Sequence, residues 1–179
     1  GEGVRRSRVL GDLLDLSVLE HGQVNLNIRQ GGRNEILDHA IAATGAETGR
    51  RVLVRKGLND VTLNTDMDRL AQVFINLIAN AQKYCDADHP VLTIDTQVKD
   101  GQLLVDFIDN GTGIGAEAQD VIFEKFSRIG DQQAGGAGLG LAICREIMAR
   151  LGGAILYLPG QQGAAFRVSL PLPVRMAAQ

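Results

Sequence analysis

Apolar residues recur along this chain with two different periods, one typical of helices and one typical of strands. A spacing of three or four residues puts apolar side chains on one face of a helix, and alternation puts them on one face of a strand. The helical period predicts helices over residues 4–21, 34–48, 67–85 and 138–151. Alternating or short apolar runs predict strands over residues 24–28, 51–55, 61–64, 91–99, 103–109, 154–158 and 164–170.

The order of these elements predicts an α+β fold. Strand runs cluster between helices, which favours a two-layer α/β sandwich with helices on one face of a sheet. Asp100 and Gly101 separate two of the strands and predict a hairpin, while residues 57–60 predict a turn between two others. Residues 114–135 have no long periodic run, and a loop of that length is usually functional or disordered.

The helix over residues 4–21 carries a stripe of leucines and ends before Gly22, where a helix-terminating glycine is expected. The stripe comprises Leu10, Leu13, Leu14, Leu16 and Leu19. We expect a separate N-terminal helix that precedes the main domain. Its natural partners would be absent from this chain, so the stripe should be exposed and should self-associate through Leu10, Leu13 and their neighbours.

Composition narrows the function classes. The chain has 179 residues, enough for one ordinary domain and a helical appendage. Its 18 basic and 21 acidic side chains are nearly balanced, so nothing favours nucleic-acid binding. Cys85 and Cys144 stand alone without metal-ligand spacing, which indicates a reducing, cytoplasmic compartment. No apolar run is long enough for a membrane span, and no signal peptide is visible.

The helix over residues 67–85 carries the most informative polar face, which holds Asn76, Asn80, Lys83 and Tyr84. Amide oxygens are hard ligands, and Mg²⁺ is usually held by a few protein oxygens together with substrate phosphates. A lysine can reach phosphate oxygens as a point charge, and a tyrosine ring can lie against a base. The pattern therefore predicts one wall of a metal–nucleotide site, although a merely solvated helix face would show the same residues.

A first glycine-rich segment follows the strand over residues 103–109. That strand ends in Asp109, and Gly111 and Gly113 come next. An ionised carboxylate only accepts hydrogen bonds, and the exocyclic amine of adenine is a donor, so Asp109 would select adenine over guanine. The glycines would let the backbone turn sharply and approach the base. The plainer alternative is a turn without a ligand.

A second glycine-rich segment, with Gly136, Gly138 and Gly140, opens the helix over residues 138–151. It is neither a dinucleotide-binding fingerprint nor a P-loop, because no strand precedes it and no Gly-Lys-Ser/Thr follows. Backbone N–H groups at the beginning of a helix still favour phosphate. A flexible loop would show the same pattern.

Together these segments resemble the ATP-binding catalytic domain of sensor histidine kinases. Residues 76–84 resemble the N box, 109–114 the G1 box, 122–128 the F box and 136–142 the G2 box, in the order of the family. Residues 12–20 resemble the end of the second helix of the kinase dimerisation hairpin, and residues 152–171 the last two strands of the family. The resemblance implies the Bergerat fold, a two-layer α/β sandwich with a mixed sheet.

The resemblance also implies roles for individual residues. Asn80 would ligate Mg²⁺, and Asn76 and Lys83 would be the catalytic residues at the phosphates. Phe123 would help to pack down a lid over the nucleotide, and Arg128 could reach the phosphates. The full set expected to contact ATP comprises Asn76, Asn80, Lys83, Tyr84, Asp109, Gly111, Gly113, Ile114, Phe123, Arg128, Gly136, Gly138, Leu139 and Gly140.

The implied function is to donate the γ-phosphoryl group of ATP to a histidine, for relay to an aspartate of a response-regulator receiver domain. His21, His39 and His89 lack a phosphoacceptor context, so the acceptor would lie on a dimerisation helix of a homodimeric bacterial kinase, outside this chain. Residues 1–22 would be a remnant of that hairpin, 23–175 the catalytic domain and 176–179 a tail. The sequence leaves open an inner-membrane anchor elsewhere in the parent protein.

Two other functions remain open at this stage. Clamp ATPases of the gyrase and MutL type share the fold, but they use a glutamate as general base one turn before the Mg-binding asparagine. Asn76 occupies that position here, and an amide cannot accept the proton. A module that only senses the nucleotide would keep the same site, so the sequence does not separate it from a kinase.

Overall fold

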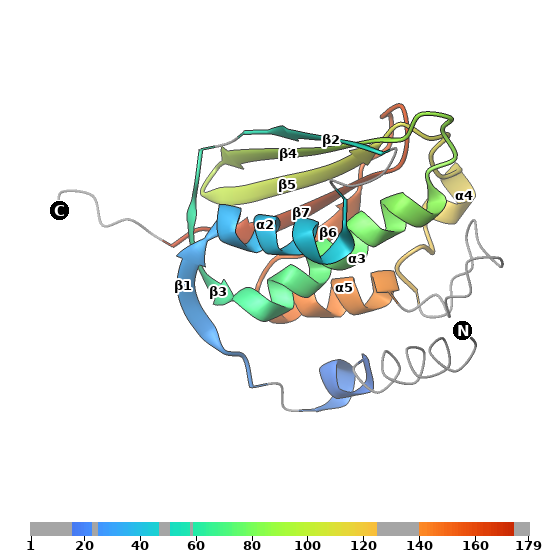
Figure 1. Cartoon of the computed structure of the whole chain (residues 1–179). Coiled ribbons are helices and arrows are strands. Elements are labelled where there is room, and N and C mark those ends of the chain that lie inside the picture. Colours follow the sequence, from blue (N-terminus) through green and yellow to red (C-terminus); the bar gives the residue numbers. More distant parts are fainter. Residues whose placement is uncertain (1–15, 23–24, 47–50, 58, 125–139, 174–179) are drawn as a thin grey trace.

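The computed structural model describes residues 16–22, 25–46, 51–57, 59–124 and 140–173. In this part of the chain a sheet forms one layer and helices form the other (Figure 1). The helices α2 (Arg33–Thr44), α3 (Met67–Tyr84) and α5 (Gly140–Arg150) lie on one face of the sheet (Figure 1). The expected two-layer α/β sandwich is therefore confirmed.

The main sheet has five strands among the described residues, and it is mixed. Its spatial order is β2 (Val52–Lys56), β4 (Val91–Lys99), β5 (Gln102–Asp109), β7 (Ala165–Pro171) and β6 (Ala154–Tyr157). β2 and β4 are parallel, whereas the other neighbours are antiparallel. A second, two-stranded sheet joins β1 (Ile28–Gly32) to β3 (Thr62–Asp66).

The β4–β5 hairpin is formed as expected. Lys99 pairs with Gln102, so the loop between the strands is Asp100-Gly101. Both loop residues have positive φ, 53° and 74° respectively, which is the type I′ geometry that matches the twist of the flanking strands. This register puts Asp109 opposite Leu92, at the end of β5 farthest from the turn.

Helix α3 begins where the sequence predicts, because Asp66 caps it. One oxygen of this carboxylate accepts a hydrogen bond from the Arg69 N–H at 3.1 Å, and the other accepts from the Asn27 N–H at 3.0 Å. The apolar face of the helix packs on the sheet, where the rings of Phe74 and Phe107 lie 5.4 Å apart. Its buried residues are Met67, Leu70, Ala71, Val73, Phe74, Leu77 and Ile78.

Several details of the elements differ from the sequence prediction. The strand predicted over residues 24–28 is wrong, because β1 extends over Ile28–Gly32, where pairing with β3 outweighs the weak local alternation. The predicted strands on either side of residues 57–60 do not pair with each other, since β2 pairs with β4 and β3 with β1. Helix α2 ends at Thr44, just before Gly45, rather than at residue 48.

The described end of the N-terminal helix, residues 16–21, packs against the rest of the molecule. Leu16 and Leu19 are each only 1% exposed and belong to the core, so the expectation of an exposed stripe is wrong for these two residues. The Arg150 guanidinium of α5 donates to the Leu19 carbonyl, with Nε at 3.0 Å. Gly22 donates to the Val18 carbonyl at 2.8 Å. Leu10, Leu13 and Leu14 lie outside the described residues.

Candidate nucleotide-binding site

The polar face of α3 lies beside the beginning of α5. The Asn76 amide donates to the Gly140 carbonyl at 3.5 Å and approaches the Cys144 thiol at 3.7 Å. The structure therefore brings together an N-box residue and a G2-box residue that are 64 positions apart. Asn80 follows one turn later and is half-buried, whereas Lys83 is exposed and Tyr84 is 40% exposed.

The Cys144 thiol lies between these helices. Burial raises its pKa to about 12, although the hydrogen bond from Asn76 acts in the opposite direction. The thiol also points to the Val73 carbonyl of α3, at 3.9 Å. It is therefore protonated at neutral pH and serves packing between α3 and α5 rather than nucleophilic chemistry.

Asp109 ends β5 and is 9% exposed. Its Oδ1 atom accepts two backbone hydrogen bonds, from the Gly111 N–H at 2.9 Å and from the Ala164 N–H at 3.0 Å. Both of these hydrogen bonds end at Oδ1, and the hydrogen bonds found among the described residues include none to Oδ2. One oxygen of the carboxylate thus fixes the loop, and the other keeps its capacity to accept hydrogen bonds.

Two further side chains hold the loop that follows Asp109. Asn110 accepts from the Val91 N–H at 2.8 Å and donates to the His89 carbonyl at 2.9 Å, which ties the loop to the beginning of β4. Asp86, just beyond α3, accepts from both the N–H and the hydroxyl of Thr112, each at 2.9 Å. These two bonds lower the pKa of the exposed Asp86 carboxyl, so it is ionised at neutral pH.

The loop then turns at Gly113, whose φ of 81° suits glycine and few other residues. The next N–H, that of Ile114, donates to the phenol oxygen of Tyr157 in β6 at 3.2 Å. Tyr157 packs edge-on against Phe166, and Phe166 also packs edge-on against Phe123, with ring centroids 5.5 Å and 6.1 Å apart. The F-box Phe123 therefore contacts the core through Phe166.

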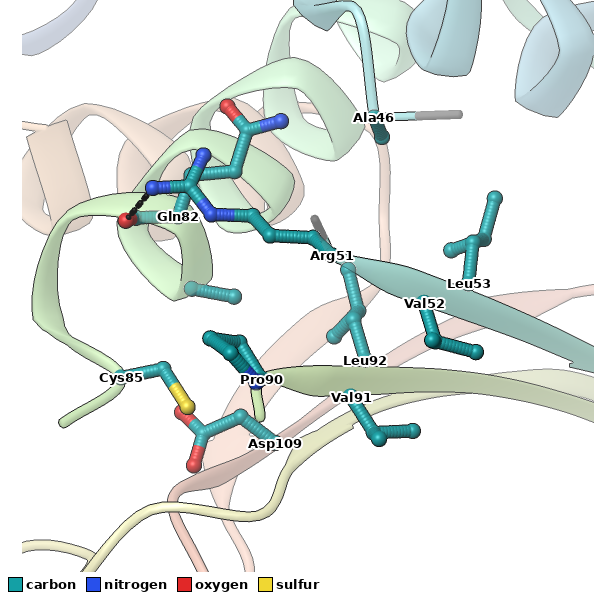
Figure 2. Close-up of a pocket in the computed structure, with 11 residues that line it drawn as sticks. Ala46, Arg51, Val52, Leu53, Gln82, Cys85, Pro90, Val91, Leu92 and Asp109 are labelled. Carbon is teal, nitrogen blue, oxygen red and sulfur yellow. Dashed lines mark hydrogen bonds between the residues drawn. The ribbon is translucent and has the colours of Figure 1, made fainter. Parts of the chain in front are cut away.

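A small hollow adjoins Asp109, between the end of α3, β2 and the beginning of β4 (Figure 2). Its volume is about 20 Å³, room for about one water molecule, whereas small-molecule sites usually enclose at least ~300 Å³. Arg51 donates to the Gln82 carbonyl at 2.6 Å beside it. The hollow is too small for a purine, so a base would have to lie elsewhere against Asp109. Its lining comprises Ala46, Arg51, Val52, Leu53, Ala81, Gln82, Cys85, Pro90, Val91, Leu92 and Asp109.

Comparison with known proteins identifies the family. The model of the family described as histidine kinase-, DNA gyrase B-, and HSP90-like ATPase matches residues 65–174. The chain belongs to this ATPase family. The match begins just before α3 and ends just beyond β7, so it covers the polar face of α3, the Asp109 loop and the beginning of α5.

Relatives of this ATPase domain are bacterial sensor kinases. The chain is 34% identical to the Escherichia coli sensor protein KdpD over 169 residues, covering 92% of this chain and 19% of KdpD. It is 32% identical to the E. coli sensor histidine kinase RcsC, again over 92% of this chain but 18% of that protein. The chain thus spans about a fifth of the length of these relatives.

The fold matches solved histidine kinase structures. The Acinetobacter baumannii histidine kinase AdeS superposes with a TM-score of 0.77 at 26% identity, covering 94% of this chain and 79% of that chain. The predicted family and the predicted Bergerat-type fold, with a mixed sheet and helices on one face, are therefore confirmed.

The structure describes ten of the fourteen predicted site residues, and one of these, Phe123, packs against Phe166. The structure gathers Asp109, Gly111, Gly113 and Ile114 in one loop, and it joins Asn76 to Gly140. Asn80, Lys83 and Tyr84 occupy the same helix as Asn76. Arg128, Gly136, Gly138 and Leu139 lie outside the described residues.

The sequence did not reveal the side chains that support this loop: Asp86, Asn110 and Tyr157. Each acts through tertiary hydrogen bonds, for which local periodicity gives no signal. Asn110 does lie within the motif at residues 109–114, and Asp86 lies two residues after the motif at 76–84; that proximity is the available hint.

The oxygen atoms on the polar face of α3 also suit a hard metal ion that is coordinated by the protein and by a bound ligand together. The described residues contain no group of three or more His, Cys, Asp or Glu side chains that could hold a metal by themselves. The Asn80 amide oxygen is a hard donor on the polar face of α3, and Mg²⁺ commonly takes one or two protein oxygens together with phosphate oxygens. Asn80 therefore fits a magnesium ion that arrives with a phosphate ligand.

Proposed function

We propose that this chain is the ATP-binding catalytic domain of a sensor histidine kinase, which binds Mg-ATP and donates its γ-phosphoryl group to a histidine outside residues 1–179. The observation that carries the proposal is the Asp109 carboxylate. One of its oxygens accepts from Gly111 and Ala164, so the other is left to accept from a ligand at a buried position. An acceptor of this kind matches the exocyclic amine of adenine and mismatches the carbonyl oxygen of guanine.

The remaining roles follow from the polar face of α3. Lys83 contacts phosphate oxygens as a point charge, and Asn76, which is tied to α5, supports the phosphate end of the site. Asn80 would hold Mg²⁺, whose charge would offset that of the phosphates. Phosphoryl transfer needs positioning and charge neutralisation more than covalent participation by the protein.

An ATP-hydrolysing clamp is the weaker alternative. Hydrolysis needs a general base that activates water. The position one turn before Asn80 holds Asn76, whose amide nitrogen donates to the Gly140 carbonyl. An amide does not accept a proton from water at neutral pH, so Asn76 cannot be the base that such an enzyme needs.

The partners follow from the kinase proposal. The acceptor histidine would belong to the dimerisation helices of a homodimeric parent, with residues 1–22 as the end of that hairpin, 23–175 as the catalytic domain and 176–179 as a tail. A response-regulator receiver domain would take the phosphoryl group next, on the cytoplasmic side of the membrane. No helix among the described residues is long and apolar enough to cross a bilayer.

Incubation of the chain with γ-labelled ATP tests the proposal. We expect no stable, acid-labile label on the chain alone at any protein concentration, and phosphorylation once a dimerisation hairpin with its histidine is fused to the N-terminus. Label on His21, His39 or His89 would overturn the claim that the acceptor lies outside the chain. Failure of the fusion to become labelled, despite bound ATP, would favour the nucleotide-sensing alternative.

Substitution of Asn80 tests the metal role. We expect Asn80→Ala to remove most of the enhancement that Mg²⁺ gives to ATP binding, because an amide ligand is lost at the phosphate end. Adenosine affinity should stay within about twofold, since the base end is unchanged. Calorimetric titration with ATP and adenosine, each with and without Mg²⁺, measures both effects. An equal loss for ATP and adenosine in a folded variant would contradict the role given to Asn80.

A further inference from the structure

The backbone of the loop after Asp109 is held by side chains from three separate parts of the fold. The Gly111 N–H donates to Asp109 at the end of β5, the Thr112 N–H to Asp86 beyond α3, and the Ile114 N–H to Tyr157 of β6. These protein acceptors use the N–H groups before any ligand is present. The loop is therefore shaped in advance for a ligand, which lowers the ordering cost of binding.

Of these acceptors, Tyr157 is the most distant from the loop in the sequence, 43 residues from Ile114. It lies on an edge strand, β6, and its neighbour β7 separates it from β5, which carries Asp109. Its ring is fixed by the edge-on contact with Phe166, with centroids 5.5 Å apart and planes at 82°. Its oxygen also lies 3.6 Å from the place that a β-carbon on Gly113 would occupy. The phenol is thus held directly against the turn at residues 113–114.

We propose that Tyr157 is a positioning residue for nucleotide recognition, which holds the Gly113–Ile114 turn so that Asp109 faces the base. The inference rests on the proposed nucleotide site, and it assigns a role to a residue from a strand outside the N, G1, F and G2 boxes. Tyr157 acts through the loop and does not itself touch the ligand. Without its oxygen, the Ile114 N–H loses its protein acceptor, while the bonds of Asp109 to Gly111 and of Asp86 to Thr112 remain. The Gln119 amide still donates to the Ile114 carbonyl at 2.8 Å.

The variant Tyr157→Phe tests this inference, because it removes the oxygen and keeps the ring against Phe166. We expect the Kd values for adenosine, ADP and ATP each to rise by about three- to tenfold, the size of one lost hydrogen bond. The loss should be equal for the three ligands, because the turn supports the base and not the phosphates. Exchange of the Ile114 amide hydrogen should become faster in the ligand-free variant.

Leu156→Ala is the matched control, because Leu156 is the neighbouring residue on β6 and is 50% exposed. It should leave all three Kd values unchanged. A purely structural role for Tyr157 would lower the melting temperature and speed amide exchange across β6 and β7, with unchanged nucleotide affinity in the folded protein. That result, or parental Kd values in Tyr157→Phe, would overturn the inference.

Nucleotide binding by the unmodified chain distinguishes a failure of this inference from a failure of the proposed function. Absence of nucleotide binding by the parent would remove the proposed function, and the inference with it. Binding by the parent together with unchanged binding by Tyr157→Phe would remove the inference alone.

Discussion

Asp109→Asn should weaken ATP binding by about thirtyfold or more and leave the fold intact. The asparagine oxygen can still accept from the Gly111 and Ala164 N–H groups, which hold Oδ1 in the parent. The other atom becomes an NH₂ donor that faces the donor amine of adenine. Loss of a charged, buried acceptor costs about 2 kcal/mol or more, which corresponds to about thirtyfold in affinity. Calorimetric titration measures the loss, and thermal unfolding checks the fold.

Asp109→Ala provides the contrast. It removes the acceptor for Gly111 and Ala164 as well, so it should lower both ATP affinity and the melting temperature, whereas Asp109→Asn should lower chiefly the affinity. If a folded Asp109→Asn variant bound ATP as tightly as the parent, this carboxylate would not accept a hydrogen bond from the base.

Gly163→Ala should have the largest combined effect on stability and binding. A β-carbon at residue 163 would lie 2.3 Å from both the carbonyl oxygen and Oδ1 of Asp109, and 2.7 Å from the Gly111 nitrogen. Two of these atoms belong to the backbone, so the loop itself must move. We expect a loss of about 1–3 kcal/mol in the free energy of unfolding, together with a loss of more than about tenfold in ATP affinity as Asp109 shifts.

Gly115→Ala is the control for this steric argument. Gly115 has φ of −64°, and a β-carbon there would meet nothing within 4 Å. It should bind ATP and unfold like the parent. If Gly163→Ala also behaved like the parent, the close approach of residue 163 to Asp109 would not be needed for the site.

Elements with strong local signals were predictable from the sequence. Helix α3 has an apolar face that recurs at helical spacing and an aspartate cap at Asp66, so period and capping agree on its beginning. The β4–β5 hairpin is specified by Asp100-Gly101 between two alternating runs. Asp109 ends the second of these runs, so the same pattern predicts its place at the end of a strand.

Features set by tertiary contacts were not predictable. β1 lacks a strong apolar alternation and is defined by its ladder with β3. The sequence predicts an exposed stripe that includes Leu16 and Leu19, because no pattern within one helix indicates that another element covers it. The structure buries both leucines, and the Arg150 guanidinium donates to the Leu19 carbonyl. Asp86 and Tyr157 reach the loop from other elements, and only the folded chain brings them there.

The most direct test of the nucleotide site is titration of the unmodified chain with ATP and GTP, each with and without Mg²⁺. The geometry of Asp109 predicts that ATP binds at least about thirtyfold more tightly than GTP, because guanine presents a carbonyl oxygen where adenine presents a donor. Mg²⁺ should strengthen the binding of ATP. Equal affinity for ATP and GTP, or no binding of either by the folded chain, would contradict the account.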